Sequence, residues 1–260
     1  MKKYKHLYLF SAIPIAIIFI YRYLPVLGAL IAFKDYRISL GFAGIFTSPN
    51  AEQYGFHNFI RLFTSMVFYR VLSNTVIISA YKLIITFPLP IILALMLNEI
   101  RNMHFKKVVQ TISYLPYFLS ATIIYGIILS LLSPVNGLIN NLAVVLGGQP
   151  TYYLADPKWF RTIVVLWDVW QLTGWNSIIY LAAIASINPE LYESAVSDGA
   201  STMQQIWHIT LPGIIPIIVI MLVFRIGGLL DAGFEQIFLM YSPPVYSVAD
   251  IINTYMLCGF

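Results

Sequence analysis

The chain has 260 residues, of which 59% are hydrophobic and 10% are charged, and its formal net charge is +4. Soluble domains carry about 25% charged residues, so this composition excludes an ordinary soluble protein and indicates one embedded in a membrane. The small, dispersed positive charge gives no support for a nucleic acid partner. The single cysteine, Cys258, excludes an internal disulfide bond, and the four histidines lack the spacing of metal ligands, so no metal site is expected.

The first apolar stretch, residues 7–32, follows the basic sequence Met-Lys-Lys-Tyr-Lys. This arrangement is also found in signal peptides, but no convincing small-x-small cleavage site follows, and the run continues into Tyr21-Arg-Tyr-Leu24. We therefore expect an uncleaved first membrane helix.

Further stretches reach the length of about 20 mostly apolar residues that a membrane-spanning helix needs. With the first they predict an all-α membrane protein of five spans, the later four being 71–97, 111–132, 159–187 and 211–230. Pro88 and Pro90 interrupt the second span and Pro116 lies early in the third, so kinks are expected there, because proline removes a backbone donor.

Basic residues suggest the orientation in the cell (inner, cytoplasmic) membrane. Lysines at the N-terminus place it in the cytosol, and Arg101, Lys106 and Lys107 mark residues 98–110 as a cytosolic loop. The connectors 33–70 and 133–158 then lie outside and 188–210 lies inside. The distribution of Lys and Arg gives only modest support for this orientation, because the external connector 33–70 also carries basic residues.

The loop 188–210 is acidic and contains Glu190, Glu193 and Asp198. No Lys or Arg occurs between Arg161 and Arg225, whereas short cytosolic loops normally collect basic residues. A loop that departs from this rule is a candidate contact surface. The alternative is a plain solvated connector between two helices.

The loop also carries a spaced motif: Glu193-x-Ala195-x-x-Asp198-Gly199-Ala200, then eight residues, then Ile209-x-Leu211-Pro212. This motif resembles the cytoplasmic coupling loop of the permeases of binding-protein-dependent ABC importers. Other blocks along nearly the whole chain resemble the sugar-importer branch, more narrowly its oligosaccharide or polysaccharide permeases: Tyr23-Leu-Pro25, Ala32-Phe-Lys-Asp-Tyr36, Asn98-Glu-Ile-Arg101, Leu154-Ala-Asp-Pro-Lys-Trp-Phe160 and Gly233-Phe-Glu-Gln-Ile-Phe238.

The resemblance implies the transmembrane domain of a type I ABC importer. It also implies the partners: a second permease chain, two ATPase subunits, an extracytoplasmic solute-binding protein and a saccharide substrate. This chain has no Gly-Lys pair and hence no phosphate-binding P-loop, so ATP and Mg²⁺ would be bound by the partner ATPase. No cofactor and no catalytic residue are expected here.

In such a permease the loop would dock into a cleft on the ATPase. The candidate coupling residues are those of the motif: Glu193, Ser194, Ala195, Asp198, Gly199, Ala200, Ile209, Leu211 and Pro212. One short helix is expected to end at Ser197, a turn to form at Gly199, and a second short helix to run from Ser201 to Ile209 before Pro212 opens the next span. Glu193 and Asp198 are candidates for pairing with basic groups of the ATPase or for capping the short helices.

The fourth span carries a polar face, since Asp168, Gln171 and Trp175 follow i, i+3, i+7 spacing and Asn176 is adjacent. A carboxylate inside a span is costly and usually faces a cavity or a partner. Planar hydrogen-bonding groups beside aromatic rings are typical of sugar sites, so these four residues are candidates for the substrate path. The alternative is a polar contact between helices. Arg225 in the fifth span would pair with Asp168 or Asp231, or extend toward an interface.

The expected organisation is an N-terminal helix with an external connector over residues 1–69 and the transmembrane domain over 70–260. Members of the family usually have a further helix, and no apolar run follows Leu230, so the sequence predicts a chain truncated at its C-terminus. Two other hypotheses stay open: an intramembrane enzyme acting on lipid-linked glycans, with Asp168 as its acid or base, and a non-transporting scaffold. The absence of Gly-x-Ser-x-Gly and His-Glu-x-x-His disfavours the enzyme.

Overall fold

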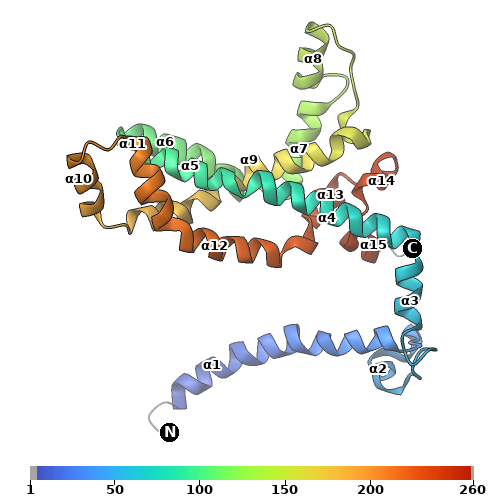
Figure 1. Ribbon diagram of the computed structural model, residues 1–260. Coiled ribbons are helices and arrows are strands. Elements are labelled where there is room, and N and C mark those ends of the chain that lie inside the picture. Colours follow the sequence, from blue (N-terminus) through green and yellow to red (C-terminus); the bar gives the residue numbers. More distant parts are fainter. Residues whose placement is uncertain (1–4, 259–260) are drawn as a thin grey trace. The chain divides into compact units, whose positions relative to one another are not determined.

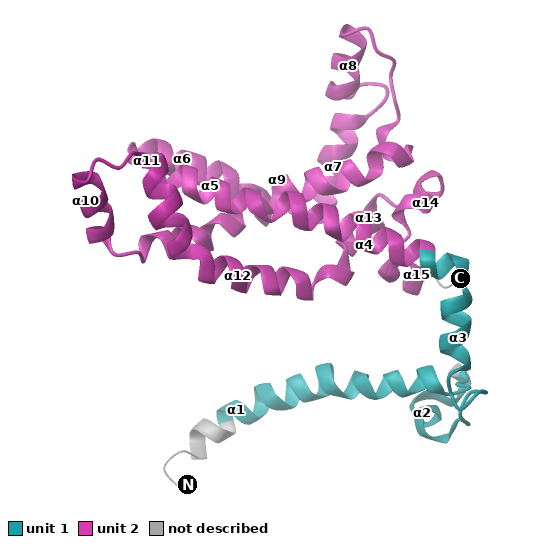
Figure 2. Cartoon of the chain, viewed as in Figure 1, with its two compact units in different colours: residues 1–69 teal, residues 70–260 magenta. Residues whose placement is uncertain are grey.

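The computed structural model describes residues 5–258, and within this range it contains helices but no strand (Figure 1). The chain divides into two compact units, residues 1–69 and 70–260 (Figure 2).

The first unit consists of one long apolar helix followed by short helices. Helix α1 (Lys5–Ile18) continues through a π-helical turn (Phe19–Tyr23) into a 3₁₀ helix (Leu24–Phe33). Further along lie a 3₁₀ helix (Ile38–Ala43), α2 (Gly44–Thr47) and α3 (His57–Thr64). The Asn58 amide on α3 donates to the carbonyls of Ala32 and Lys34, at 3.1 and 3.2 Å, and so ties α3 to the end of the long helix.

The second unit is built around α9 (Pro157–Ala185), whose 29 residues make it the longest single α-helix described (Figure 1). Asp156 caps its first turn by accepting from the Lys158 amide at 2.9 Å, and Pro157 occupies its first position, where no donor is needed. Around α9 lie α5 (Pro88–Glu99), α6 (Met103–Tyr114) and α12 (Leu211–Gly227).

Two buried apolar clusters hold these helices together. The first joins α5, α9 and α12 through Ile91, Tyr180 and Ile214. The second joins α9 to α4 (Met66–Thr86), α7 (Ala121–Leu132), α13 (Phe234–Leu239) and α14 (Tyr246–Ala249), and Trp167 and Phe160 are its largest members. The remaining helices are α8 (Leu138–Val145), α10 (Pro189–Ser197), α11 (Thr202–Gln205) and α15 (Ile252–Cys258).

Three described helices are long and apolar enough to cross a membrane: Phe10–Phe33, Met66–Glu99 and Thr202–Gly227. The second of these is divided at Phe87, directly before Pro88, as the prolines predict. Helix α9 is not among the candidates; it carries the charged residues Lys158, Arg161 and Asp168. The total of five spans therefore stays a prediction.

The kink expected at Pro116 within residues 111–132 is present and large, because the helices Met103–Phe118 and Ala121–Leu132 meet at an angle of 104°. Pro116 lacks a backbone donor and lies in a 3₁₀ turn, after which Leu119 and Ser120 are extended. The Ser120 hydroxyl then accepts from the Ile123 amide at 3.3 Å and starts α7 in a new direction. The pair is either one broken span or a re-entrant loop.

The C-terminal segment folds back onto α4 through polar contacts. The Asn74 amide donates to the carbonyls of Ser247 and Asp250, at 3.0 and 3.1 Å, and accepts from the Arg161 guanidinium at 2.7 Å. Arg70 pairs with the Asp250 carboxylate at 2.7 Å. Asn74 thus links α4 to α9 and to the C-terminal segment through its side-chain amide.

Candidate functional site

The acidic loop forms a hairpin whose first arm is α10. Asn188 caps this helix by accepting from the Glu190 amide at 3.1 Å. The helix ends in a Schellman motif, in which the Ala200 amide donates to the Ala195 carbonyl at 2.9 Å and the Gly199 amide to the Val196 carbonyl at 3.0 Å. Gly199 has a φ of +79°, so the turn predicted at this glycine is present.

The second arm differs from the prediction. Ser201 and Gln204 form a capping box at the start of α11, which runs through a π-helical turn (Ile206–Thr210) directly into α12. A separate short helix ending at Ile209 is therefore wrong, because residues 202–227 form one continuous helix. The π turn, in which the Leu211 amide donates to the Ile206 carbonyl, precedes Pro212 and shifts the backbone bonding so that the proline does not end the helix.

The tip of the hairpin exposes acidic and apolar side chains together. Glu193 and Asp198 are exposed and bond to no other side chain among the described residues, while the N-caps of α10 and α11 are Asn188 and Ser201 instead. Four large apolar side chains beside them are at least half exposed: Leu191, Val196, Met203 and Trp207. The arms are joined by a 2.9 Å hydrogen bond between the hydroxyls of Tyr192 and Thr210.

The candidate coupling residues are distributed along this hairpin. Those from Glu193 to Ala200 lie on α10 and its turn, while Ile209, Leu211 and Pro212 lie at the base of the second arm, where the π turn meets α12. An exposed tip of apolar and acidic side chains, on two arms that are hydrogen-bonded to each other, is suited to a docking surface.

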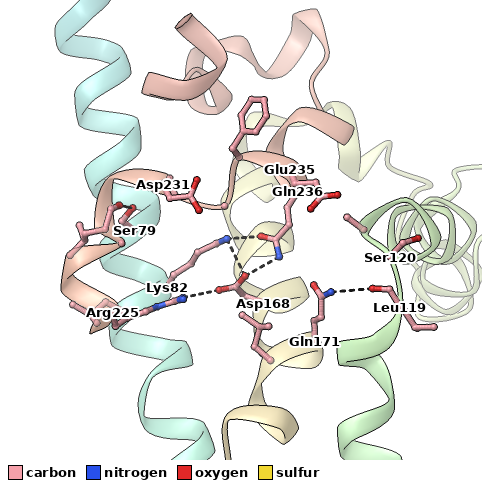
Figure 3. Close-up of a pocket in the computed structure, with 18 residues that line it drawn as sticks. Ser79, Lys82, Leu119, Ser120, Asp168, Gln171, Arg225, Asp231, Glu235 and Gln236 are labelled. Atoms are coloured by element: carbon pink, nitrogen blue, oxygen red, sulfur yellow. Dashed lines mark hydrogen bonds and ion pairs between the residues drawn. The ribbon is translucent and has the colours of Figure 1, made fainter. Parts of the chain in front are cut away.

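A cavity of about 540 Å³ lies in the second unit, beside α4, α9 and the segment that follows α12 (Figure 3). Its polar lining includes Ser79, Lys82, Asp168, Gln171, Arg225 and Gln236, with Asp231 and Glu235 beside them. A second cavity of about 220 Å³ lies further along α9 and is lined by Thr86, Phe87, Pro90, Asn176, Tyr180 and Arg225, among others.

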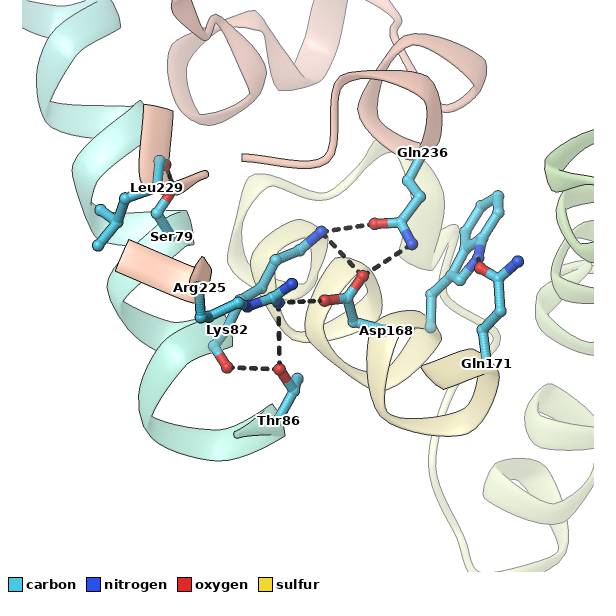
Figure 4. Close-up of polar contacts among 9 residues, drawn as sticks. Ser79, Lys82, Thr86, Asp168, Gln171, Arg225, Leu229 and Gln236 are labelled. Carbon is cyan, nitrogen blue, oxygen red and sulfur yellow. Dashed lines mark hydrogen bonds and ion pairs between the residues drawn. The ribbon is translucent and has the colours of Figure 1, made fainter. Parts of the chain in front are cut away.

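Four of these residues form a bonded group that we call the Asp168 cluster: Lys82, Asp168, Arg225 and Gln236 (Figure 4). The carboxylate of Asp168 accepts from the Lys82 ammonium at 3.1 Å and from the Gln236 amide at 2.9 Å on one oxygen, and from the Arg225 guanidinium at 2.9 Å on the other. Lys82 also donates to the Gln236 carbonyl oxygen at 2.5 Å. The cluster joins α4, α9, α12 and α13, and its bonds offset the cost of burying these charges.

The cluster decides between the alternatives left open for Arg225, which pairs with Asp168 rather than with Asp231. Sequence reasoning missed Gln236 and the partner of Lys82. The available signal was that a lysine, an aspartate and an arginine each interrupt a different apolar stretch, since such charges tend to pair with one another. Both oxygens of Asp168 already bond to cations, an arrangement that suits a member of ion pairs better than a general acid or base.

The four candidates for the substrate path do not form one group. Asp168 and Gln171 line the larger cavity and Asn176 lines the smaller one. Trp175 lines neither of the two; its ring stacks on Tyr117 with centroids 4.4 Å apart and planes 3° apart, so it packs α9 against the 3₁₀ helix Leu115–Phe118. Within residues 5–258 no three His, Cys, Asp or Glu side chains gather in a way that could hold a metal ion.

Comparison with known proteins places this architecture in a family. Residues 86–257 match the model of the binding-protein-dependent transport system inner membrane component. The chain belongs to this family. It is 44% identical, over 97% of its length and 77% of the relative's, to the polygalacturonan/rhamnogalacturonan transport system permease protein YteP of Bacillus subtilis (strain 168). It is 41% identical to Protein LplB of the same organism, over 98% of its length and 79% of the relative's.

Solved structures agree with the sequence relatives. A chain of a bacterial ABC transporter involved in the import of the acidic polysaccharide alginate is 42% identical, with a TM-score of 0.87 over 98% of this chain and 84% of that chain. A chain of the bacterial alginate ABC transporter in complex with an alginate pentasaccharide-bound periplasmic protein gives a TM-score of 0.88 at 42% identity, over 98% of this chain and 83% of that one. The membrane fold is therefore the all-helical fold of type I ABC importer permeases.

Proposed function

We propose that this protein is the permease subunit of an ATP-driven importer for oligosaccharides or polysaccharide fragments. The observation that carries the proposal is the polar cavity between α4, α9 and the segment after α12, in a chain 42% identical to a permease of an alginate importer. A saccharide presents hydroxyls in every direction, and the amides, hydroxyl and charged groups of this cavity supply both donors and acceptors. The protein itself catalyses no reaction in this proposal.

The hairpin at residues 193–212 is the proposed link to a separate ATPase. Because residues 202–227 are one helix, a displacement of the hairpin would be transmitted along α12 to Arg225 at the cavity. ATP-driven closure of the ATPase pair would move this helix against α9 and turn the cavity from one side of the membrane to the other. Such rigid-body movement of helices around a fixed site is a general route to alternating access.

The proposed assembly has a second permease subunit and two ATPase subunits that bind ATP and Mg²⁺ in the cytosol. An extracytoplasmic solute-binding protein would deliver the saccharide, by analogy with the alginate transporter solved with its pentasaccharide-bound periplasmic protein. The permease would lie in the cytoplasmic membrane with its N-terminus in the cytosol, consistent with Lys2, Lys3 and Lys5 there.

The test is transport by the complete importer reconstituted in lipid vesicles. We expect the charge reversals Glu193→Lys and Asp198→Lys, made together, to abolish ATP-dependent uptake of oligosaccharide and to weaken co-purification of the ATPase. The matched control is Glu52→Lys, which reverses an exposed acid outside the hairpin and should leave both measurements unchanged. Normal uptake and normal ATPase binding by the double variant would refute the coupling role, and no uptake by the unaltered importer would refute the transport function.

A further inference from the structure

The charges of the Asp168 cluster do not balance, because two cations, Lys82 and Arg225, share the single carboxylate of Asp168. The two cations are placed differently. The Lys82 side chain is 5% exposed and is held by both Asp168 and Gln236, whereas the Arg225 side chain is 36% exposed. Lys82 and Asp168 thus neutralise each other inside the protein, and Arg225 carries the surplus positive charge at the surface of the cavity.

Arg225 also stands between the two cavities. It is the residue that the linings of the larger and the smaller cavity have in common. Its guanidinium bonds to Asp168 on the side of the larger cavity, and at 3.3 Å to the hydroxyl of Thr86, which lines the smaller one (Figure 4). Along α9 the larger cavity is lined at Gln171 and the smaller one at Asn176, so the guanidinium of Arg225 lies where the two cavities adjoin.

The guanidinium has donors to spare. Both of its described bonds, to Asp168 and Thr86, come from one terminal nitrogen, Nη2. A guanidinium presents five N–H donors in a planar fork that matches the two oxygens of a carboxylate, which a lysine ammonium does not. A cation that is one-third exposed, and only partly used by the protein, is therefore suited to binding an anionic group that enters the cavity.

An exchange of partners at Arg225 would leave no buried charge unpaired. If Arg225 moves away, Asp168 keeps its bonds to Lys82 and Gln236 on its other oxygen. Removing the sole partner of a buried charge is strongly unfavourable, and this arrangement avoids that penalty. The Lys82–Asp168 pair can thus stay fixed while the Arg225 contact opens and closes.

Two further carboxylates, Asp231 and Glu235, line the larger cavity, and in Figure 3 they lie on the other side of Lys82 from Arg225. Both are exposed, and Asp231 accepts from the Asn253 amide at 3.1 Å. Water screens exposed charges of this kind, so they affect an anion beside Arg225 less than the guanidinium in contact with it does.

We propose that Arg225 binds a carboxylate of an acidic, uronate-containing saccharide during transport, and that by exchanging Asp168 for this carboxylate it opens the passage between the two cavities. The proposal rests on the proposed transport function and names its substrate class. Arg225 is then a residue that both selects the substrate and separates the two halves of its path.

The test compares two probes that differ only in charge. One is a labelled oligogalacturonide and the other is the same oligomer with its carboxylates methyl-esterified. ATP-dependent uptake of each is measured in vesicles that contain the complete importer, with the same solute-binding protein throughout. Because only the permease varies, a change in the uptake ratio of acid to ester reports on Arg225 and not on the binding protein.

We expect Arg225→Gln to lower uptake of the acidic oligomer about tenfold or more, as the loss of a charge-assisted contact predicts, and to change uptake of the ester less than about twofold. Arg225→Lys keeps the charge without the fork and should also lower the acid-to-ester ratio, by a smaller factor. Arg70→Gln, a matched change at an arginine that lines neither of the two cavities, should leave the ratio as it is.

An equal loss of both probes in Arg225→Gln would mean a purely structural role and would overturn the proposal. If the Arg225→Gln variant does not assemble, the test uses Arg225→Lys instead. An acid-to-ester uptake ratio equal to that of the unaltered importer would then refute the proposal. Uptake of the ester alone by the unaltered importer would refute the acidic substrate while leaving saccharide transport in place.

Discussion

The ammonium of Lys82 on α4 lies 3.1 Å from the carboxylate of Asp168 on α9, and each of these side chains is only 5% exposed. Two charges so buried are stable only as partners, and removing one of them from such a pair costs about 3–5 kcal/mol. The pair therefore fixes α4 against α9 at the wall of the larger cavity. Arg225 is a second cation on the same carboxylate. The loss of stability on replacing any one of the three residues therefore depends on the net charge of the two that remain.

This charge count predicts a ranking of variants. Asp168→Asn leaves Lys82 and Arg225 as two cations without an anion, whereas Lys82→Met leaves Asp168 and Arg225 as a balanced pair. We expect Asp168→Asn to lower the midpoint of thermal unfolding of the detergent-solubilised importer more than Lys82→Met does. The double variant should recover part of the loss, because its cluster again carries a single positive charge. If the two single variants lowered the midpoint equally and the double variant lowered it by their sum, the two residues would not act as a pair.

A second prediction concerns Gly233, which lies in the lining of the larger cavity. Its φ is +81°, and a Cβ placed on it would lie 2.2 Å from Nζ of Lys82 and 2.8 Å from Oε1 of Gln236. Gly233→Ala must therefore strain the backbone and displace the ammonium that neutralises Asp168. We expect Gly233→Ala to lower ATP-dependent uptake of oligosaccharide by the reconstituted importer.

The control for this change is Gly227→Ala, six residues earlier. Its Cβ would meet no atom within 4 Å, and the position is helical, where alanine is favoured over glycine. Gly227→Ala should transport normally with unchanged or slightly higher thermal stability. If Gly233→Ala transported and unfolded like Gly227→Ala, the loop at Gly233 could not lie as close to Lys82 as the structure places it.

Local sequence rules predicted some parts of the candidate site correctly. The turn at Gly199 was predictable because a helix that ends in a glycine with positive φ is a short-range motif. The pairing of Arg225 with Asp168 was one of two pairings open to it, because a charge in an apolar stretch must find a partner. Gln236 gave no such signal, since a neutral amide has no required partner and its role depends on where the chain folds back.

The sequence does not show how strongly a proline bends or ends a helix, because its effect depends on the residues around it. Pro212 was expected to open a new helix, but the π turn before it lets the helix continue from Thr202 to Gly227. The kink expected at Pro116 is present, but its size of 104° depends on Ser120, which caps a new helix there. Helical spacing placed Trp175 on one face with Asp168, but spacing along one helix does not show the stacking of its ring on Tyr117 of another segment.

A third prediction tests the contact between α6 and α9. A Cβ on Gly174 would lie 1.9 Å from the Ser113 carbonyl oxygen, which is backbone and cannot rotate away. Gly174→Ala should force the two helices apart and lower the thermal unfolding midpoint of the purified importer, with a cost in the range of an overpacked core, about 1–3 kcal/mol. Gly126→Ala on α7, where a Cβ would meet nothing within 4 Å, is the matched control and should be neutral or slightly stabilising. A midpoint unchanged in both variants would contradict the close crossing of α6 and α9.

The final prediction separates the backbone requirement of the hairpin from its surface. Gly199 has a φ of +79°, and a Cβ there would meet no atom within 4 Å, so any penalty on substitution is conformational. Asparagine enters the left-handed region more readily than most residues and valine is among the least able to, which ranks the variants Gly199→Asn above Gly199→Val. We expect Gly199→Val to expose the Asp198–Ala200 turn to faster proteolysis and to reduce both ATPase co-purification and uptake, while Gly199→Asn retains most of each. The two side chains have similar bulk, so equal loss in both would mean that the space around Gly199, occupied by a docked partner, matters more than its backbone conformation.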